Sequence, residues 1–189
     1  MELMITDVFA KCFKYHDRGP SDHDPPDREV NLFVCESTAY KRMEAKGLCK
    51  RGIVPHFYGT IKNIQPRLWP DLNMFLEDKL PPNAVLIEYI PNMEPIMLSN
   101  YSKHYMEHLN QILHDIHKAG VLHGDPMPRN MMISRGERNK VLWIDFDSAQ
   151  TFSENRLSPR QGMWIKEEIE IMDYFVEGLV GFSHYLSQR

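Results

Sequence analysis

The feature that most constrains this chain is a pair of segments, VLHGDPMPRN at residues 121–130 and VLWIDFDSA at residues 141–149. In the first segment, the prolines that follow Asp125 break any helix or strand and leave its acidic and amide side chains in a loop. In the second, an apolar run leads directly to Asp145, which puts this carboxylate at the end of a strand. The turn-forming sequence RGERN lies between the segments and predicts a hairpin that brings Asn130 and Asp145 together.

The rest of the chain alternates strand and helix patterns, which predicts an α+β fold. A strand-rich half extends to about residue 90, and a mostly helical half follows at residues 91–189. The predicted elements are a strand at 3–13, a helix at 28–46, strands at 54–64 and 84–90, a helix ending at 119 and capped by Ser99 or Asn100, hairpin strands at 131–134 and 141–146, and a helix at 161–185.

Composition argues against two classes of partner. The formal net charge of −4, with scattered Lys and Arg, gives no basic surface for nucleic acid. The N-terminal sequence MELMITDVFAKCF has acids where a signal peptide has cations, and no apolar run approaches the roughly 18 residues of a membrane span. The three cysteines show no CxxC spacing, which predicts reduced thiols. We expect a cytoplasmic or nuclear protein that binds neither nucleic acid nor membrane.

The loop and the strand end carry side chains suited to metal and phosphate chemistry. Mg²⁺ takes few oxygen ligands from a protein and completes its octahedron with phosphate and water. The amide of Asn130 and the carboxylate of Asp145 could bind it in this way. Asp125 would face the same point and could accept a proton from an attacking hydroxyl, which is worth about 10²–10⁴ in rate.

HGDPMPRN followed by WIDFD resembles the catalytic and metal-binding loops of the protein-kinase-like superfamily, with the pattern H-x-D-x-x-x-x-N and then D-F-G or a variant. The HGD form with DFD looks closer to the aminoglycoside phosphotransferase branch and to small fungal kinase-like domains than to regulated protein kinases. The resemblance implies a bilobal fold with an N-lobe at residues 1–90 and a mostly helical C-lobe at residues 91–189. It also implies that Asp125 is the catalytic base, Asn130 a catalytic-loop residue and Mg²⁺ ligand, and Asp145 the main Mg²⁺ ligand.

The resemblance extends toward the N-terminus. VFAKCF resembles the strand whose lysine reaches the α- and β-phosphates of ATP, which makes Lys11 that lysine. FVCESTAYKRM resembles the helix whose glutamate pairs with the lysine, which makes Glu36 that glutamate. AVLIEYIP resembles the strand and hinge that bind adenine through backbone groups, so residues from Glu88 to Ile90 would supply those contacts.

The chain departs from the family pattern at four points. The glycine-rich loop and the first two strands of the family precede the lysine strand, where this sequence begins, so we expect an N-lobe that lacks its first strands. Phe9 stands where the family has a small alanine. Met127 stands where Ser/Thr kinases have a lysine, with Arg129 as a possible substitute. Gly124 replaces the arginine that grips a phosphorylated activation loop, so control of that kind is not expected.

These features predict an ATP- and Mg²⁺-dependent phosphotransferase that acts on a hydroxyl acceptor, either a protein or a small molecule. The alternative is a pseudokinase-like binding module that no longer turns over ATP. Lys11 could instead be a surface lysine, and Glu36 an exposed helix acid. Asp147 could assist a second metal ion or bond the loop backbone, and His123 is expected to brace the loop.

Overall fold

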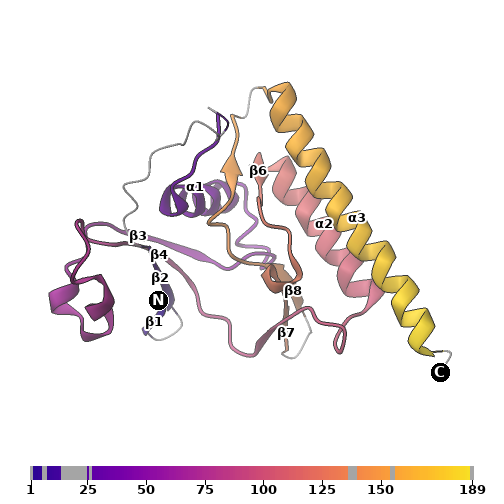
Figure 1. Cartoon of the computed structure of the whole chain (residues 1–189), viewed down its shortest axis with the longest axis horizontal. Helices are drawn as coiled ribbons and strands as arrows, with labels where there is room; N and C mark the ends of the chain where they lie inside the picture. Colours follow the sequence, from indigo (N-terminus) through magenta and orange to yellow (C-terminus); the bar gives the residue numbers. More distant parts are fainter. Residues whose placement is uncertain are drawn as a thin grey trace.

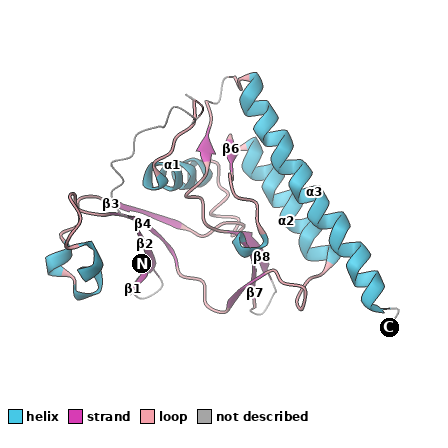
Figure 2. Ribbon diagram, viewed as in Figure 1, coloured by secondary structure: helices cyan, strands magenta, loops and turns pink. Residues whose placement is uncertain are grey.

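The protein has an α+β fold made of small antiparallel sheets and helices (Figures 1 and 2). The largest sheet lies beside α1 (Leu32–Ala45), and the long helices α2 (Lys103–Lys118) and α3 (Pro159–Ser187) lie side by side at the other end of the molecule (Figure 1). The computed structural model describes residues 2–5, 8–13, 25, 27–135, 140–153 and 156–187.

The largest sheet has four antiparallel strands in the order β1, β2, β4, β3. β1 (Glu2–Ile5) pairs with β2 (Val8–Phe13), so the prediction of one strand over residues 3–13 is wrong, and a strand does precede the one that carries Lys11. Apolar residues recur in both strands, so periodicity alone does not mark the boundary between them. β4 (Asn83–Glu88) lies between β2 and β3 (Phe57–Ile61), which is shorter than predicted.

Helix α1 begins after residue 31, later than the predicted residue 28. Glu29 accepts hydrogen bonds from the backbone N–H groups of Val30 at 3.0 Å and Asn31 at 2.9 Å, which holds this stretch in a turn. Asn31 then caps the helix by accepting a hydrogen bond from the Val34 N–H at 3.2 Å. The chain leaves the helix through Gly47 at φ +78°, as the sequence predicted.

Tyr40 on α1 joins the sheet to the segment that carries Asp145. Its ring stacks on Phe57 of β3 with centroids 5.9 Å apart and meets Phe146 edge-on at 5.4 Å. All three rings belong to one continuous core that extends into the long helices. Because Phe146 follows Asp145 directly, this packing fixes the position of the carboxylate relative to α1.

Both predicted long helices are present, but α3 begins at Pro159 rather than at residue 161, and the cap of α2 differs from the prediction. Ser102 caps α2 by accepting a hydrogen bond from the Tyr105 N–H at 3.2 Å, so the predicted caps Ser99 and Asn100 are wrong. Asn100 instead accepts a hydrogen bond from the Met97 N–H at 2.8 Å in the preceding turn. The predicted apolar positions of α2 that are fully buried are Leu109, Ile112, Leu113 and Ile116.

The predicted hairpin is confirmed, although its turn residues 136–139 lie outside the described residues. Its second strand ends before Asp145 rather than at residue 146, because Asp145 adopts φ +66°, a left-handed conformation that a strand cannot continue. The remaining short elements are β5 (Met93–Pro95), β6 (Val121–Leu122), β7 (Met131–Ser134), β8 (Lys140–Trp143), β9 (Gln150–Thr151) and the 3₁₀ helices η1 (Pro66–Leu68), η2 (Pro70–Phe75) and η3 (Pro128–Asn130).

Two further observations bear on the environment of the chain. Among the described residues, no helix combines the length and apolar character that a membrane crossing requires. Cys12, Cys35 and Cys49 are buried free thiols. Burial raises the pKa of Cys35 to about 12 and that of Cys49 to about 11, which keeps both thiols protonated.

Candidate functional site

A cavity of about 640 Å³ lies between the four-stranded sheet and the loops around β7 and β8. Its apolar wall includes Phe9 from β2 and Met132 from β7. The volume is within the range of small-molecule sites. The sequence-predicted residues that line it are Lys11, Glu36, Glu88, Ile90, Asn130 and Asp145.

Lys11 is the centre of a charged cluster on the cavity wall. Its Nζ lies 3.3 Å from Glu36 Oε2 and 3.0 Å from Asp147 Oδ2. It also contacts Asp145 Oδ1 directly. Burial alone would lower the pKa of Lys11, but the surrounding carboxylates outweigh burial and raise it above its ordinary value. Lys11 therefore carries a permanent positive charge into the cavity and is not a surface lysine.

Glu36 is buried, with 1% of its side chain exposed, and so is not one of the exposed acids of its helix. Burial, helped by repulsion from Asp145 and Asp147, raises its pKa to about 7 against the attraction of Lys11. Its Oε1 has no hydrogen-bond partner among the described residues. Glu36 therefore positions Lys11 with a carboxyl group whose pKa of about 7 leaves it partly protonated near neutral pH.

This shift predicts a stability that depends on pH. We expect the free energy of unfolding of the wild type, relative to Glu36→Gln, to fall by about 3 kcal/mol as pH rises from 4.5 to about 7. In this window the folded protein retains the Glu36 proton that the unfolded chain releases. Lys11 does not contribute, because it is protonated in both states below its ordinary pKa of 10.5. Urea unfolding across this pH range measures the difference, and parallel pH profiles would contradict it.

Asp125 is not among the residues that line the cavity, but two neighbours in its own loop that do line it, Arg129 and Asn130, hold its side chain. Arg129 Nη2 donates to both of its carboxylate oxygens, at 2.9 and 2.7 Å. Asn130 Nδ2 donates to Asp125 Oδ2 at 2.8 Å and to the Asp125 backbone oxygen at 2.9 Å. Because the nitrogen of the Asn130 amide is used in this way, its carbonyl oxygen is the atom available to a ligand.

His123 braces this loop, as predicted. It is fully buried, its Nε2 lies 3.0 Å from the Ile144 backbone oxygen, and its Nδ1 accepts a hydrogen bond from the Asp125 N–H at 3.3 Å. Burial lowers its pKa, so the ring is neutral and carries its proton on Nε2. Together with the hydrogen bond from the Ile144 N–H to the Asn130 backbone oxygen at 3.1 Å, it ties the loop to the segment before Asp145.

Glu168 on α3 is a positioning residue that the sequence did not reveal. Its carboxylate is 4% exposed and accepts hydrogen bonds from the backbone N–H groups of His123 at 3.0 Å and Gly124 at 2.8 Å. Its Oε2 also lies 2.6 Å from His117 Nε2. The signal in the sequence is an acid four residues before Met172, within the apolar stripe of the last helix.

Gly124 is required for the approach of this loop to the segment after Asp145. It has φ +81°, and a Cβ at this position would lie 2.2 Å from the Ser148 backbone oxygen. We expect Gly124→Ala to reduce the free energy of unfolding by about 3 kcal/mol or more, through steric overlap and backbone strain. Chemical denaturation measures this loss.

Gly162 is the matched control for that substitution. A Cβ there would meet no described atom within 4 Å, and the residue is in α3. We expect Gly162→Ala to stabilise the protein by about 0.5–1 kcal/mol, because alanine has less freedom to lose on forming a helix. Equal effects of the two substitutions would contradict the close approach at Gly124.

The donor set fits a magnesium–nucleotide ligand. A carboxylate from Asp145 and an amide oxygen from Asn130 are hard ligands of the kind that Mg²⁺ binds. The ammonium of Lys11 on the same wall could receive a phosphate group. For Asp147 the sequence left open a second metal ion or a bond to the loop backbone. In the structure its carboxylate accepts hydrogen bonds from two side chains, Lys11 Nζ at 3.0 Å and Ser148 Oγ at 3.2 Å.

Comparison with models of known protein families finds no match for this chain, and comparison with curated proteins finds no match either. Its function is therefore inferred from the geometry of the site.

Proposed function

We propose that this chain is an ATP- and Mg²⁺-dependent phosphotransferase with a bilobal, kinase-like fold, in which residues 1–90 are the N-lobe and residues 91–189 the C-lobe. The proposal depends mainly on the charged cluster in the cavity. There Lys11 contacts Glu36 of α1 and Asp145, which follows β8 more than a hundred residues later in the sequence. A lysine held between a buried helix carboxylate and an acid at a strand end is arranged to receive phosphate groups.

The apolar part of the cavity is suited to the base of a nucleotide. Phe9 of β2 and Met132 of β7 contribute apolar walls. β4 ends at Glu88, so the backbone groups of the next residues, up to Ile90, are outside the ladder of this sheet and line the same cavity. Adenine would bind to these backbone groups, with its phosphates directed toward Lys11.

The acidic groups would then have separate roles. Mg²⁺ held by Asn130 and Asp145 would neutralise the charge that develops on the transferred phosphate. Asp125 would accept the proton of the acceptor hydroxyl, and Arg129 keeps that carboxylate in position with two hydrogen bonds. The acceptor is a hydroxyl on a protein or a small molecule.

Two observations favour a second candidate, a pseudokinase-like module that binds without turnover. Phe9 occupies part of the cavity wall where a small residue would leave room for the base. Lys11 also contacts Asp145, so a nucleotide must compete with an existing ion pair. Both features lower the affinity that we expect for ATP.

Calorimetric titration with ATP, with and without Mg²⁺, tests the proposal, followed by an assay for ADP release. Mg²⁺-dependent binding with ADP release is the expected result. Binding without ADP release would favour the second candidate. Absence of binding at millimolar ATP, in protein shown to be folded, would contradict the phosphotransferase.

A further inference from the structure

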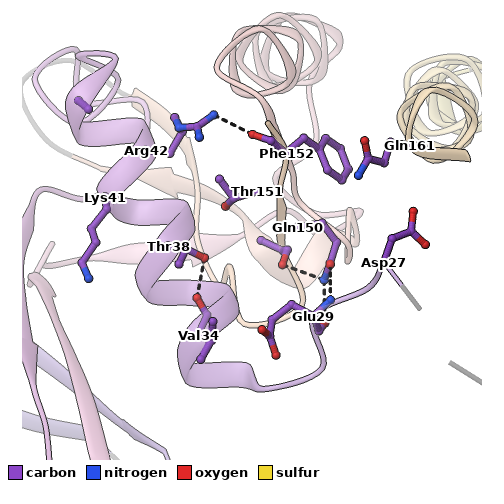
Figure 3. Close-up of a pocket in the computed structure, with 12 residues that line it drawn as sticks. Asp27, Glu29, Val34, Thr38, Lys41, Arg42, Gln150, Thr151, Phe152 and Gln161 are labelled. Carbon is purple, nitrogen blue, oxygen red and sulfur yellow. Dashed lines mark hydrogen bonds between the residues drawn. The ribbon is translucent and has the colours of Figure 1, made fainter. Parts of the chain in front are cut away.

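Helix α1 is attached near both of its ends to β9 and the residue after it, in the segment that follows Asp145 (Figure 3). β9 in turn pairs with β6, which leads directly into the loop that carries Asp125. The attachment at the N-terminal end of α1 is made by Gln150, and the attachment at its C-terminal end by Arg42. Glu36 lies between these two points on the helix.

Gln150 of β9 holds the chain just before α1. Its Oε1 accepts the Glu29 N–H at 2.8 Å, and its Nε2 donates to the Glu29 backbone oxygen at 3.0 Å (Figure 3). Gln150 is 4% exposed, and its Nε2 also donates to the Ala149 backbone oxygen at 2.9 Å. A buried amide that bonds both backbone groups of one residue fixes the place of that residue. Because the Glu29 carboxylate also accepts the next two N–H groups, Gln150 fixes the start of the helix.

Arg42 holds the other end of α1. Its Nη1 donates to the backbone oxygens of Ala119 at 3.2 Å and Phe152 at 3.1 Å, the second of which is drawn in Figure 3. Ala119 is the C-cap of α2, where the helix dipole favours a cation. The Phe152 N–H donates to the Gly120 oxygen at 2.8 Å, so the two segments that accept from Arg42 are themselves joined.

Two attachments at opposite ends leave α1 little freedom to move. A helix of 14 residues is about 21 Å long, so a contact at one end alone would let the other end swing. With both ends held, the middle of the helix keeps one position. That position places Glu36 Oε2 3.3 Å from Lys11 Nζ.

The ion pair with Lys11 is not sufficient to hold α1 in this place. Lys11 also contacts Asp145 and Asp147, so it keeps carboxylate partners without Glu36. Burial raises the pKa of Glu36 to about 7, which weakens the pair near neutral pH. The position of α1 therefore depends on contacts elsewhere on the helix: the packing of Tyr40 and the two polar attachments at its ends.

We propose that Gln150 and Arg42 are positioning residues that keep Glu36 beside Lys11 in the free protein, so that the site is assembled without a regulatory event. The strand that follows Asp145 then places α1 itself, and no separate signal is needed. What this implies for turnover rests on the proposed function, whereas the placement of α1 is measurable whether or not the protein uses ATP.

Distances between two spin labels test the placement of α1. The labels are attached through Thr38→Cys on α1 and Glu170→Cys on α3, both at exposed positions, while the native cysteines are buried. With both labels on an otherwise wild-type chain, we expect one narrow distribution of distances. Gln150→Met and Arg42→Met replace each side chain by an unbranched apolar one. Each should shift the distance or roughly double the width of the distribution.

Two control substitutions make this test specific. Gln111→Met on α2 and Lys41→Met on α1 replace exposed residues that make neither attachment, and they should leave the distribution unchanged. Glu29 is exposed, so water can replace the bonds that Gln150→Met removes, and the far-UV circular dichroism should be unchanged. Should Gln150→Met fail to fold, Arg42→Met decides. Distributions like that of the wild type in both variants would overturn the proposal.

The rate of ADP release connects the placement of α1 to the reaction. At saturating ATP, with all proteins folded, we expect Gln150→Met to lower this rate by roughly tenfold or more, because a displaced Glu36 no longer directs Lys11. Gln111→Met should leave it unchanged. An unchanged rate in a variant whose α1 has moved would also overturn the proposal. If the wild type releases no ADP, the proposed function fails, and the distances still decide whether Gln150 and Arg42 place α1.

Discussion

Replacing Asp145 by alanine is expected to weaken Mg²⁺-dependent ATP binding by about 100-fold or more. The carboxylate is the only acid among the proposed Mg²⁺ ligands, and a bound divalent ion contributes several kcal/mol to interactions with phosphate. Without Mg²⁺, the variant should bind ATP more tightly than the wild type. Asp145 also contacts Lys11, so removing its carboxylate frees the lysine for phosphate. Calorimetric titrations of both proteins, with Mg²⁺ and with EDTA, measure the two effects.

Asp147→Ala is the matched control, since Asp147 contacts the same lysine at 3.0 Å without being a proposed metal ligand. It should change affinity much less in the presence of Mg²⁺. Loss of equal size in the two variants would mean that they act only through Lys11, and would contradict the metal role of Asp145.

Asp125 should give the opposite result to Asp145. We expect Asp125→Asn to lower the rate of ADP release by about 10²–10⁴ and to leave ATP affinity unchanged, because its proton is exchanged only during reaction. Asparagine is preferable to alanine, since alanine would also release Arg129 and Asn130, which donate hydrogen bonds to this side chain. A fall in affinity to match the fall in rate would contradict the role of a base.

Glu168→Ala is expected to destabilise the protein by about 3–5 kcal/mol and to reduce turnover. The substitution removes one acceptor of three hydrogen bonds and leaves the buried N–H groups of His123 and Gly124 without partners, each of which costs about 1–3 kcal/mol. The loop that carries Asp125 would lose its contact with α3. Urea unfolding measures the loss of stability. The rate of ADP release at saturating ATP shows whether the loop still holds Asp125 in place for turnover.

Glu167→Ala is the control, because this neighbouring acid is exposed. Its effect on stability should remain within about 0.5 kcal/mol. The expected pattern for Glu168 is a lower rate with little change in ATP affinity, since it contacts the loop and not the cavity. Equal stability of the two variants would contradict the role of Glu168.

Local patterns predicted several parts of this molecule correctly. The hairpin of β7 and β8 follows from two apolar runs around a turn, and the end of α1 follows from Gly47. The pairing of Lys11 with Glu36 was expected from a resemblance, and the structure brings the two side chains to 3.3 Å. Periodicity was a poorer guide to boundaries: it merged β1 with β2, because apolar residues recur in both strands.

Contacts between elements that are distant in the sequence were decided only by the tertiary structure. The sequence by itself determined which residues stand in the loop around Asp125, because prolines and an apolar run act on their neighbours. It did not indicate that Glu168 holds this loop, since that requires α3 to pack beside α2. The burial of Glu36 and the raised pKa that follows both depend on where α1 packs. The place where a helix packs depends on many weak contacts with residues from the whole chain, and a local sequence pattern does not specify those contacts.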